Sequence, residues 1–160
     1  MANNMPANHT FSTTVGGKEI IIETGKLAEQ AGGTVNIRMG DTVLFCTATM
    51  NAKPREGIDF FPLSVDYEER LYAAGRIPGG FIRREGRPSE ASILIARVTD
   101  RPLRPLFPKD LRNEVQIVVM PLVHDQEHHA DMISIMGASA ALTISDVPWA
   151  GPIGACRVGL

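Results

Sequence analysis

The sequence predicts an α+β fold in which several strands come first and strands then alternate with two helices. Residues 11–65 are dominated by β-branched and apolar runs that Gly and Pro residues separate, which is typical of strands. Segments 90–100 and 132–145 instead have the start signals and composition of helices. With 160 residues, 44% of them hydrophobic, the chain is long enough for one domain with a buried core.

The N-terminal strands are predicted from turn signals and from residue alternation. Gly16 and Gly17 separate two β-prone runs within 11–24, a pattern typical of a tight hairpin. Residues 34–38 alternate between apolar and polar side chains, as in a half-buried strand. Segment 41–50 is β-branched and mostly apolar, which indicates a central strand of the sheet.

A further strand and the first helix are predicted on either side of an arginine-rich loop. Residues 60–65 have strand composition, and Pro62 indicates an edge or a bulge. Ser89 is the expected N-cap of a helix that runs to about Asp100, with Glu90 in its first turn. Three prolines are expected to stop regular helix soon afterwards: Pro102, Pro105 and Pro108.

The C-terminal third is predicted to contain a strand, a helix and the start of another strand. Residues 115–122 have the apolar composition of a buried strand. Asp131 is the expected cap of a helix over 132–145, which is apolar or small on nearly all sides and should be buried. Three small residues suit close packing of this helix: Gly137, Ala138 and Ala140. Residues 151–160 are expected to begin a strand.

The basic residues are concentrated in one part of the chain. The net charge of −2, taken alone, argues against a nucleic-acid partner. Between Arg70 and Arg104, however, eight arginines stand against three acidic residues, so this segment has a net charge of +5. Two interpretations stay open: the arginines are solvated ion-pair partners, or they recognise phosphate. The exclusive use of arginine favours recognition, because its planar group binds phosphate through two hydrogen bonds.

The sequence shows no pattern for export or membrane insertion. The first ten residues lack the basic and apolar regions of a signal peptide, and no apolar stretch is long enough to span a bilayer. We therefore expect a cytoplasmic protein with a disordered segment at 1–10 and one domain at 11–160. Cys46 and Cys156 lie far apart without a C-x-x-C motif, so both are expected to be reduced, buried thiols.

Two polar clusters have both a chemical and a structural interpretation. Segment 124–131 holds three histidines and two aspartates that could bind a divalent metal; because no complete ligand set is recognisable, a polar loop before the helix is favoured. Asp66, Glu68 and Glu69 could be paired catalytic carboxylates. With Arg70 beside them, an ion-pair network or a subunit contact is favoured. Neither common phosphate-binding glycine motif is present.

Four motifs occur in order along the chain. They are V-D-Y-E-E-R-L-Y-A-A-G-R-I-P-G-G-F-I-R-R-E-G-R-P-S-E at 65–90, D-R-P-L-R-P-L-F-P at 100–108, G-A-S-A-A-L at 137–142 and G-P-I-G-A-C-R-V-G at 151–159. Together they resemble the first core domain of the bacterial polynucleotide phosphorylase family, from about residue 11 to residue 160. Ribonuclease PH and the exosome ring subunits share the fold and are the second choice, because they are not expected to carry the first two motifs together.

The resemblance implies a ribonuclease PH-like βαβα fold, of the ribosomal protein S5 domain 2-like type, that is incomplete at its C-terminus. It implies the N-terminal portion of a phosphorolytic 3′-to-5′ exoribonuclease, which degrades mRNA with inorganic phosphate, releases nucleoside diphosphates and can run in reverse as a nucleotidyltransferase. The family enzyme is a homotrimeric ring around a channel for single-stranded RNA, uses Mg²⁺, and joins components of RNA-degradation complexes. Its phosphate-binding serines and metal-binding aspartates lie in a second ribonuclease PH-like domain. No catalytic or metal-binding residue is therefore expected in this chain, and the isolated chain is expected to be inactive.

The resemblance also implies residues that bind RNA. The family's channel loop carries Phe-Phe-Arg-Arg, which matches Phe81, Ile82, Arg83 and Arg84. Because Ile82 replaces one aromatic residue, we expect one stacking ring, Phe81, and two arginines that bind phosphate. Arginines implicated in function in the same family domain match Arg97, Arg101 and Arg104.

The helix arginines have two open interpretations, RNA contact or stabilisation of the fold. On a helical wheel Arg97 and Arg101 share a face, which favours the RNA role. The opposite, apolar face is expected to dock on the core through Ala91, Ile95 and Val98. Arg104 lies beyond Pro102, which can redirect the chain. The alternative to an exoribonuclease portion is a stand-alone RNA-binding or structural module without catalysis.

Overall fold

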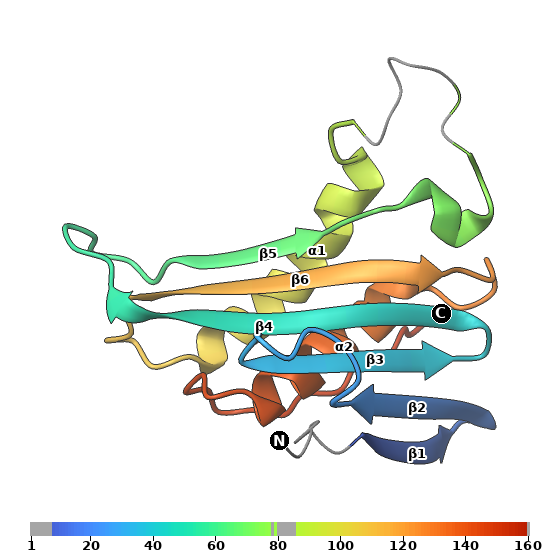
Figure 1. The fold of residues 1–160 in the computed structure, drawn as a ribbon, viewed down its shortest axis with the longest axis horizontal. Helices are drawn as coiled ribbons and strands as arrows, with labels where there is room; N and C mark the ends of the chain where they lie inside the picture. The colour runs from blue at the N-terminus through green and yellow to red at the C-terminus, as the bar shows by residue number, and fades with distance from the viewer. Residues whose placement is uncertain (1–7, 78, 80–85, 160) are drawn as a thin grey trace, which may run out of the picture.

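The computed structural model describes residues 8–77, 79 and 86–159 and has the predicted α+β architecture (Figure 1). Its six-stranded sheet has the order β1-β2-β3-β4-β6-β5. The elements are β1 His9–Val15, β2 Lys18–Thr24, β3 Gly33–Met39, β4 Thr42–Pro54, β5 Leu63–Tyr67, the 3-10 helix η1 Leu71–Ala74, α1 Glu90–Leu103, the 3-10 helix η2 Arg104–Leu106, β6 Asn113–Val123 and α2 Ala130–Ile144.

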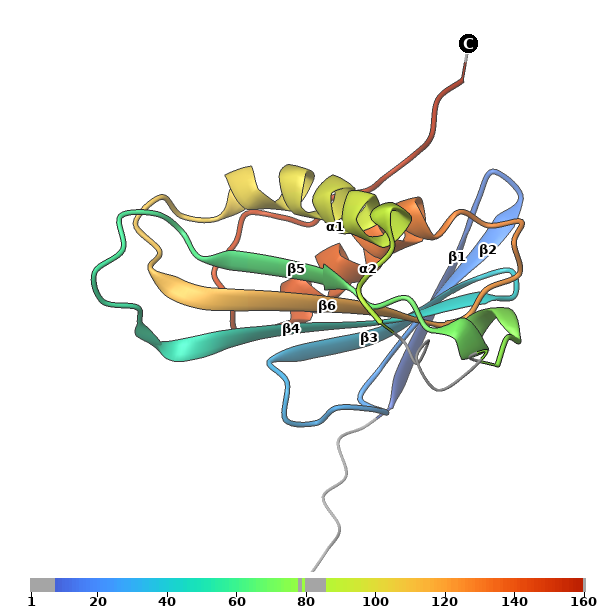
Figure 2. The ribbon, with the colours of Figure 1, turned by 90° about the horizontal axis from the view of Figure 1, so that it is seen from above.

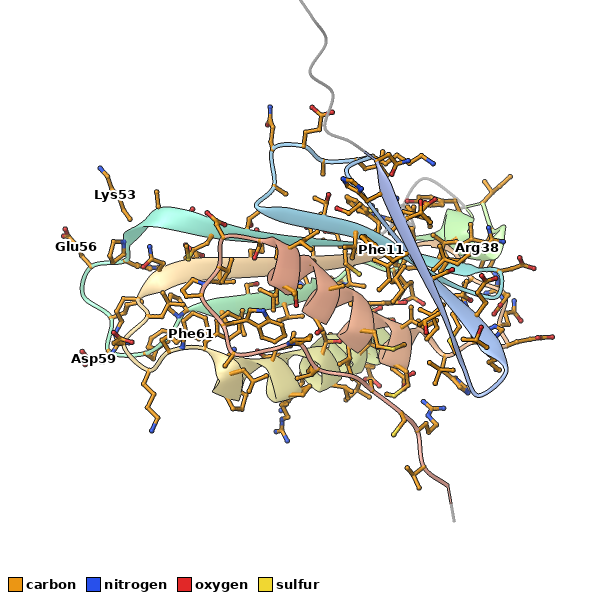
Figure 3. The ribbon with its side chains drawn as sticks, turned by 90° about the horizontal axis from the view of Figure 1, so that it is seen from below. Phe11, Arg38, Lys53, Glu56, Asp59 and Phe61 are labelled. Carbon is orange, nitrogen blue, oxygen red and sulfur yellow. The ribbon has the colours of Figure 1, made fainter. Side chains whose placement is uncertain are left out.

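The sheet is antiparallel except at its β5 edge. Strands β1 to β4 form a meander, and β6 pairs antiparallel with β4. Strand β5 pairs parallel with β6, so the chain crosses over between them through α1. Both helices lie on the same face of the sheet, as Figure 2 shows from above and Figure 3 from below. The two views together show that the β5–α1–β6 crossover is left-handed, whereas almost all connections of this kind are right-handed.

The core lies between the two helices and the central strands. On β4, Leu44, Cys46 and Ala48 are fully buried beneath the helices. At Gly137 of α2, an added Cβ would lie 2.5 Å from Cys46 Sγ and 2.9 Å from Ile37 Cγ2. The predicted close packing of this helix is therefore confirmed, and burial raises the pKa of the Cys46 thiol.

The predicted hairpin and strands are confirmed. Gly16 and Gly17 connect β1 to β2 with φ angles of 59° and 77°, which glycine adopts without strain. Strand β4 is internal to the sheet, and β5 begins directly after Pro62 at the sheet edge. Strand β1 begins at His9, slightly before the expected start of the domain.

Helix α1 is longer than predicted. It begins after Ser89, whose hydroxyl accepts the N–H of Ser92 at 3.1 Å as an N-cap does. It does not end near Asp100 but runs through Pro102 to Leu103. Pro102 removes one backbone donor in the last turn, yet the Arg104 N–H still bonds to the Asp100 carbonyl, so the helix continues.

The docking face of α1 also differs from the prediction. The residues that face the core are Ser92, Ile95, Thr99 and Leu103. Ala91 and Val98, which were expected to dock, are exposed, so the predicted apolar face is wrong at two of its three positions. Ser92 and Thr99 are buried because their hydroxyls have partners, the carboxylate of Glu69 for Ser92 and the Ile95 carbonyl for Thr99.

Three predictions in the C-terminal part are wrong. The N-cap position of α2 is His129, whereas Asp131 lies inside the first turn and forms an ion pair with Arg157. Residues 151–159 form no strand, because an extended segment becomes a strand only when it has a backbone partner. Cys156 is exposed rather than buried. In the described part of the chain, no helix has both the length and the apolar character needed to cross a membrane.

Candidate functional site

A groove with a volume of about 740 Å³ lies between β5 and α1. Figure 1 shows β5 as the outer strand of the sheet, with α1 behind it. The walls of the groove are residues 63 and 65–71, the segment 86–88, and the side of α1 that carries Ile93, Ala96 and Arg97. Four arginines from these different segments line it: Arg70, Arg87, Arg97 and Arg104.

Two of the four arginines have acidic partners. Arg70 forms an ion pair with Glu68, just after the end of β5. Arg104 forms an ion pair with Asp100 at 2.9 Å, one helical turn earlier. Neither guanidinium group is therefore free of a neighbouring carboxylate, and Glu68 and Asp100 are both engaged.

Arg104 also covers part of the free edge of β5. Its guanidinium donates to the main-chain carbonyls of Phe61 at 3.3 Å and Leu63 at 3.1 Å. The Pro62 carbonyl accepts the N–H of Val115 on β6, so the carbonyls on either side of Pro62 point away from β6. Arg104 thus satisfies the Leu63 carbonyl at the sheet edge and adds a second donor to the Phe61 carbonyl, which also accepts the N–H of Leu63 at 3.1 Å.

Arg87 and Arg97 form a different pair. Both are exposed, and neither has an ion pair or hydrogen bond with any residue in the ranges 8–77, 79 and 86–159. They line the same groove from two walls, the segment before α1 and α1 itself. Each planar guanidinium group is available to bind an anion such as phosphate through two hydrogen bonds.

The carboxylates near β5 have separate partners. Asp66 accepts hydrogen bonds from Ser64 Oγ at 3.1 Å and Gln116 Nε2 at 3.0 Å. Glu69 accepts from the hydroxyls of Ser89 and Ser92 at the start of α1. Together with the ion pair of Glu68, these contacts support the structural interpretation of the acidic cluster, in which the carboxylates hold neighbouring segments rather than one another.

Tyr67 lies at the end of β5 and lines the groove. Burial raises the pKa of its hydroxyl to about 12, and the carboxylate of Glu69 acts in the same direction, as do Cys46 and Asp131. The phenol therefore stays neutral at physiological pH and keeps its proton as a hydrogen-bond donor.

The structure describes three of the six predicted RNA-binding residues, and these three differ in their relation to the groove. Three lie outside the described residues: Phe81, Arg83 and Arg84. Arg97 lines the groove, and Arg104 lines it while bonded to Asp100 and β5. Arg101 is exposed on α1 but does not belong to the groove walls, so only one of the two helix arginines that share a wheel face lines the groove. The RNA-binding roles of all six stay predictions.

Arg87 is a groove residue that motif matching did not single out. It lies between the predicted loop arginines and the N-cap Ser89, inside the basic segment that starts at Arg70. The charge segregation of that segment is the signal that could have found it. That Arg87 and Arg97 line one groove is seen only in the tertiary structure, where the segment 86–88 and α1 both border it.

Asp125 organises the polar loop that precedes α2. Its Oδ1 accepts hydrogen bonds from Thr42 Oγ1 at 2.8 Å and from the N–H groups of Glu127 and His128, both at 2.9 Å; its Oδ2 lies 2.6 Å from His128 Nδ1. Burial alone would raise the pKa of Asp125, but these bonds outweigh it and hold the pKa well below its usual range. Among the described residues, no group of three or more His, Cys, Asp or Glu side chains is arranged to hold a metal ion.

Comparison with known proteins matches residues 16–148 to a family model described as the 3′ exoribonuclease family, domain 1. The polyribonucleotide nucleotidyltransferase of Thermomicrobium roseum is 60% identical over 154 residues, which cover 96% of this chain and 20% of the relative. That of Rubrobacter xylanophilus is 61% identical over 145 residues, which cover 91% of this chain and 21% of the relative. The chain thus spans about a fifth of the length of the curated relatives it matches.

Solved structures show the same fold. A chain of the Archaeoglobus fulgidus exosome with RNA bound to the active site superposes with a TM-score of 0.61 at 25% identity, covering 82% of this chain and 52% of that chain. Rice Rrp46 superposes with a TM-score of 0.59 at 12% identity, covering 92% of this chain and 61% of that chain, which shows likeness of fold alone. The expected ribonuclease PH-like fold is confirmed.

Proposed function

The chain belongs to the 3′ exoribonuclease family, as its domain 1, and from this membership we propose that it is the N-terminal portion of a phosphorolytic 3′-to-5′ exoribonuclease. Such an enzyme attacks the 3′ end of RNA with inorganic phosphate, releases nucleoside diphosphates and polymerises them in the reverse direction. In this proposal the groove between β5 and α1 contacts single-stranded RNA, while the reaction centre belongs to another domain.

The observation that carries the proposal is a pair of groove arginines that have no acidic partner among the residues the structure describes. Arg87 and Arg97 line one groove from two walls, and the carboxylates that line it have other partners: Asp66, Glu68, Glu69 and Asp100. Guanidinium groups bind RNA phosphates without reading the bases, which suits an enzyme that must move along any sequence. The predicted loop residues Phe81, Arg83 and Arg84 lie outside the described residues, and their RNA-binding role is part of the same proposal.

The setting of the enzyme is part of the same proposal. The family resemblance supports a homotrimer in the cytoplasm, RNA-degradation partners, inorganic phosphate as a substrate, and Mg²⁺ held by residues outside this chain. It also supports a domain that occupies 11–160 and is completed by further sequence. The mass of the assembled protein tests the homotrimer. The dependence of RNA degradation on metal and on phosphate tests the roles of Mg²⁺ and inorganic phosphate.

A chimera tests the proposed activity. Residues 1–160 would replace the matching segment of the Thermomicrobium roseum relative, to which they are 60% identical. The chimera is expected to release nucleoside diphosphates from oligo(A) only when phosphate is present, and the 160-residue chain alone is expected to release none. A chimera that assembles and binds RNA but degrades none would overturn the proposal. Phosphate-dependent release by the isolated chain would show that the reaction centre was assigned to the wrong domain.

A second candidate function is a stand-alone RNA-binding module. It is favoured by one observation: Arg87, Arg97 and both walls of the groove lie within these 160 residues. Binding of oligo(A) by the isolated chain, together with an inactive chimera, would support the module. Binding together with an active chimera would support the exoribonuclease.

A further inference from the structure

Glu69 connects the end of β5 to the start of α1 through a compact cluster of oxygens. Its Oε2 accepts hydrogen bonds from Ser89 Oγ at 2.7 Å and from Ser92 Oγ at 2.8 Å. The two serine oxygens lie 2.9 Å apart, and Ser89 Oγ also accepts the N–H of Ser92 at 3.1 Å. One carboxylate oxygen therefore holds both the N-cap residue and the first buried residue of the helix.

The protons of this cluster can be assigned by counting donors. Each serine hydroxyl carries one proton, and both hydroxyls lie within hydrogen-bond distance of the same Glu69 oxygen. With the N–H of Ser92 directed at Ser89 Oγ, the consistent arrangement has both hydroxyl protons directed at the carboxylate. Hydrogen bonds to an ionised carboxylate are about twice as strong as neutral ones, so Glu69 is a strong anchor for this turn.

The anchor lies between two segments that form the groove. On one side, Glu68 donates its N–H to the Val119 carbonyl of β6, which fixes the residue before Glu69 to the sheet. On the other side, Ser89 directly follows the wall segment 86–88 that contains Arg87. The bond between Glu69 and Ser89 thus ties the start of α1, two residues after Arg87, to the sheet.

We propose that Glu69 is a positioning residue for phosphate binding, which holds Arg87 opposite Arg97 so that the two guanidinium groups can bind adjacent phosphates of one RNA strand. This inference rests on the proposed function of the groove. An N-cap needs only Ser89 and the N–H of Ser92, so the carboxylate is not required to start the helix. Glu69 adds a connection between helix and sheet at the point where Arg87 enters the groove.

The experiment measures binding of fluorescein-labelled oligo(A) to the 160-residue chain by anisotropy over a range of salt concentrations. Glu69→Ala is expected to weaken binding about tenfold, the effect of losing one charge-assisted contact between Arg87 and a phosphate. It should also reduce the slope of log K against log salt by about 0.7, as expected when one phosphate contact on a single strand is lost. Arg87→Ala is expected to have the same two effects.

The decisive measurement is the double variant. If Glu69 acts by placing Arg87, Glu69→Ala combined with Arg87→Ala will bind no more weakly than Arg87→Ala alone. Losses that add would overturn the positioning role, since Glu69 would then affect RNA by another route. Glu69→Gln keeps one acceptor oxygen without the charge, so it should recover part of the affinity and keeps the test informative if Glu69→Ala is poorly folded.

Two further variants separate the possible failures. Glu114→Ala removes a carboxylate of β6 that accepts a hydrogen bond from Asn51 Nδ2 at 3.2 Å and does not line the groove, so it should leave RNA binding unchanged. Arg97→Ala tests the groove without touching the Glu69 cluster. If Arg97→Ala and Arg87→Ala weaken binding while Glu69→Ala does not, only the positioning role is wrong. If none of the three affects binding, the proposed function of the groove is wrong and the positioning role falls with it.

Discussion

Replacing Arg97 and Arg104 separately by alanine should separate RNA binding from stabilisation of the fold. Both side chains line the groove, but within the residues that the structure describes only Arg104 is bonded to other parts of the chain. Its guanidinium is bonded to Asp100 and to the carbonyls of Phe61 and Leu63. The two variants remove the same charge from the same groove, so each is the matched control of the other.

The magnitudes follow from these contacts. The Arg104 side chain is 43% exposed, so its ion pair with Asp100 contributes at most about 0.5 kcal/mol. Loss of the two bonds to carbonyls adds about 1 kcal/mol each, and the total cost of Arg104→Ala is about 1 to 3 kcal/mol. For a domain of this size that lowers the melting temperature by about 2 to 12 °C. Arg97 is exposed and makes no such contacts in the described part of the chain, so Arg97→Ala should change stability by less than about 0.5 kcal/mol.

The assay combines thermal unfolding with salt-dependent binding of oligo(A). Arg97→Ala is expected to keep its melting temperature and to lose about 0.7 from the slope of log K against log salt. Arg104→Ala is expected to melt earlier and to keep most of that slope, because its guanidinium is already bonded within the protein. The reasoning is refuted if Arg97→Ala melts as early as Arg104→Ala, or if its salt slope equals that of the unchanged chain.

Three further predictions concern other parts of the molecule. Because the pKa of Asp125 is lowered in the fold, its carboxylate stabilises the fold above the unfolded pKa of about 3.9, and this contribution is lost as pH falls toward the folded pKa. The melting temperature of the unchanged chain should therefore fall more steeply with decreasing pH than that of Asp125→Asn. Equal falls in melting temperature would contradict this prediction. Gly137→Ala should lower the free energy of unfolding by about 1 to 3 kcal/mol, because the added carbon overlaps Cys46 Sγ. The control Gly154→Ala, with open space around it, should leave stability unchanged. A higher melting temperature for Gly137→Ala would show that helix propensity outweighs packing. In the chimera, Phe81→Ala should weaken oligo(A) binding by about 1 to 3 kcal/mol through lost stacking, with little change in the slope of log K against log salt. Joint replacement of Arg83 and Arg84 by alanine should reduce that slope by up to about 1.4. The opposite pattern would contradict the assignment of stacking to the ring and of phosphate binding to the arginines.

The sequence by itself determined the local elements and the family. The Gly16 turn, the apolar central strand and the Ser89 cap depend on interactions between residues that are close in the chain. Positive φ angles, side-chain alternation and capping are properties of a few consecutive residues, so they can be predicted without knowing the fold. The ordered motifs then identified a family whose model matches most of the chain.

Only the tertiary structure decided which face of α1 docks and which arginines remain available. Ser92 is buried because Glu69, 23 residues earlier, accepts its hydroxyl proton, and the periodicity of the helix carries no information about that partner. Arg104 bonds to carbonyls 41 and 43 residues earlier, which leaves Arg97 and Arg87 as the groove arginines without such contacts in the described residues. A helical wheel ranks positions by hydrophobicity alone, so it predicts burial of Val98, which is exposed. Burial of the Ser92 hydroxyl and engagement of the Arg104 guanidinium by main-chain carbonyls depend on groups that the folded chain brings together, and these contacts span 23 residues or more.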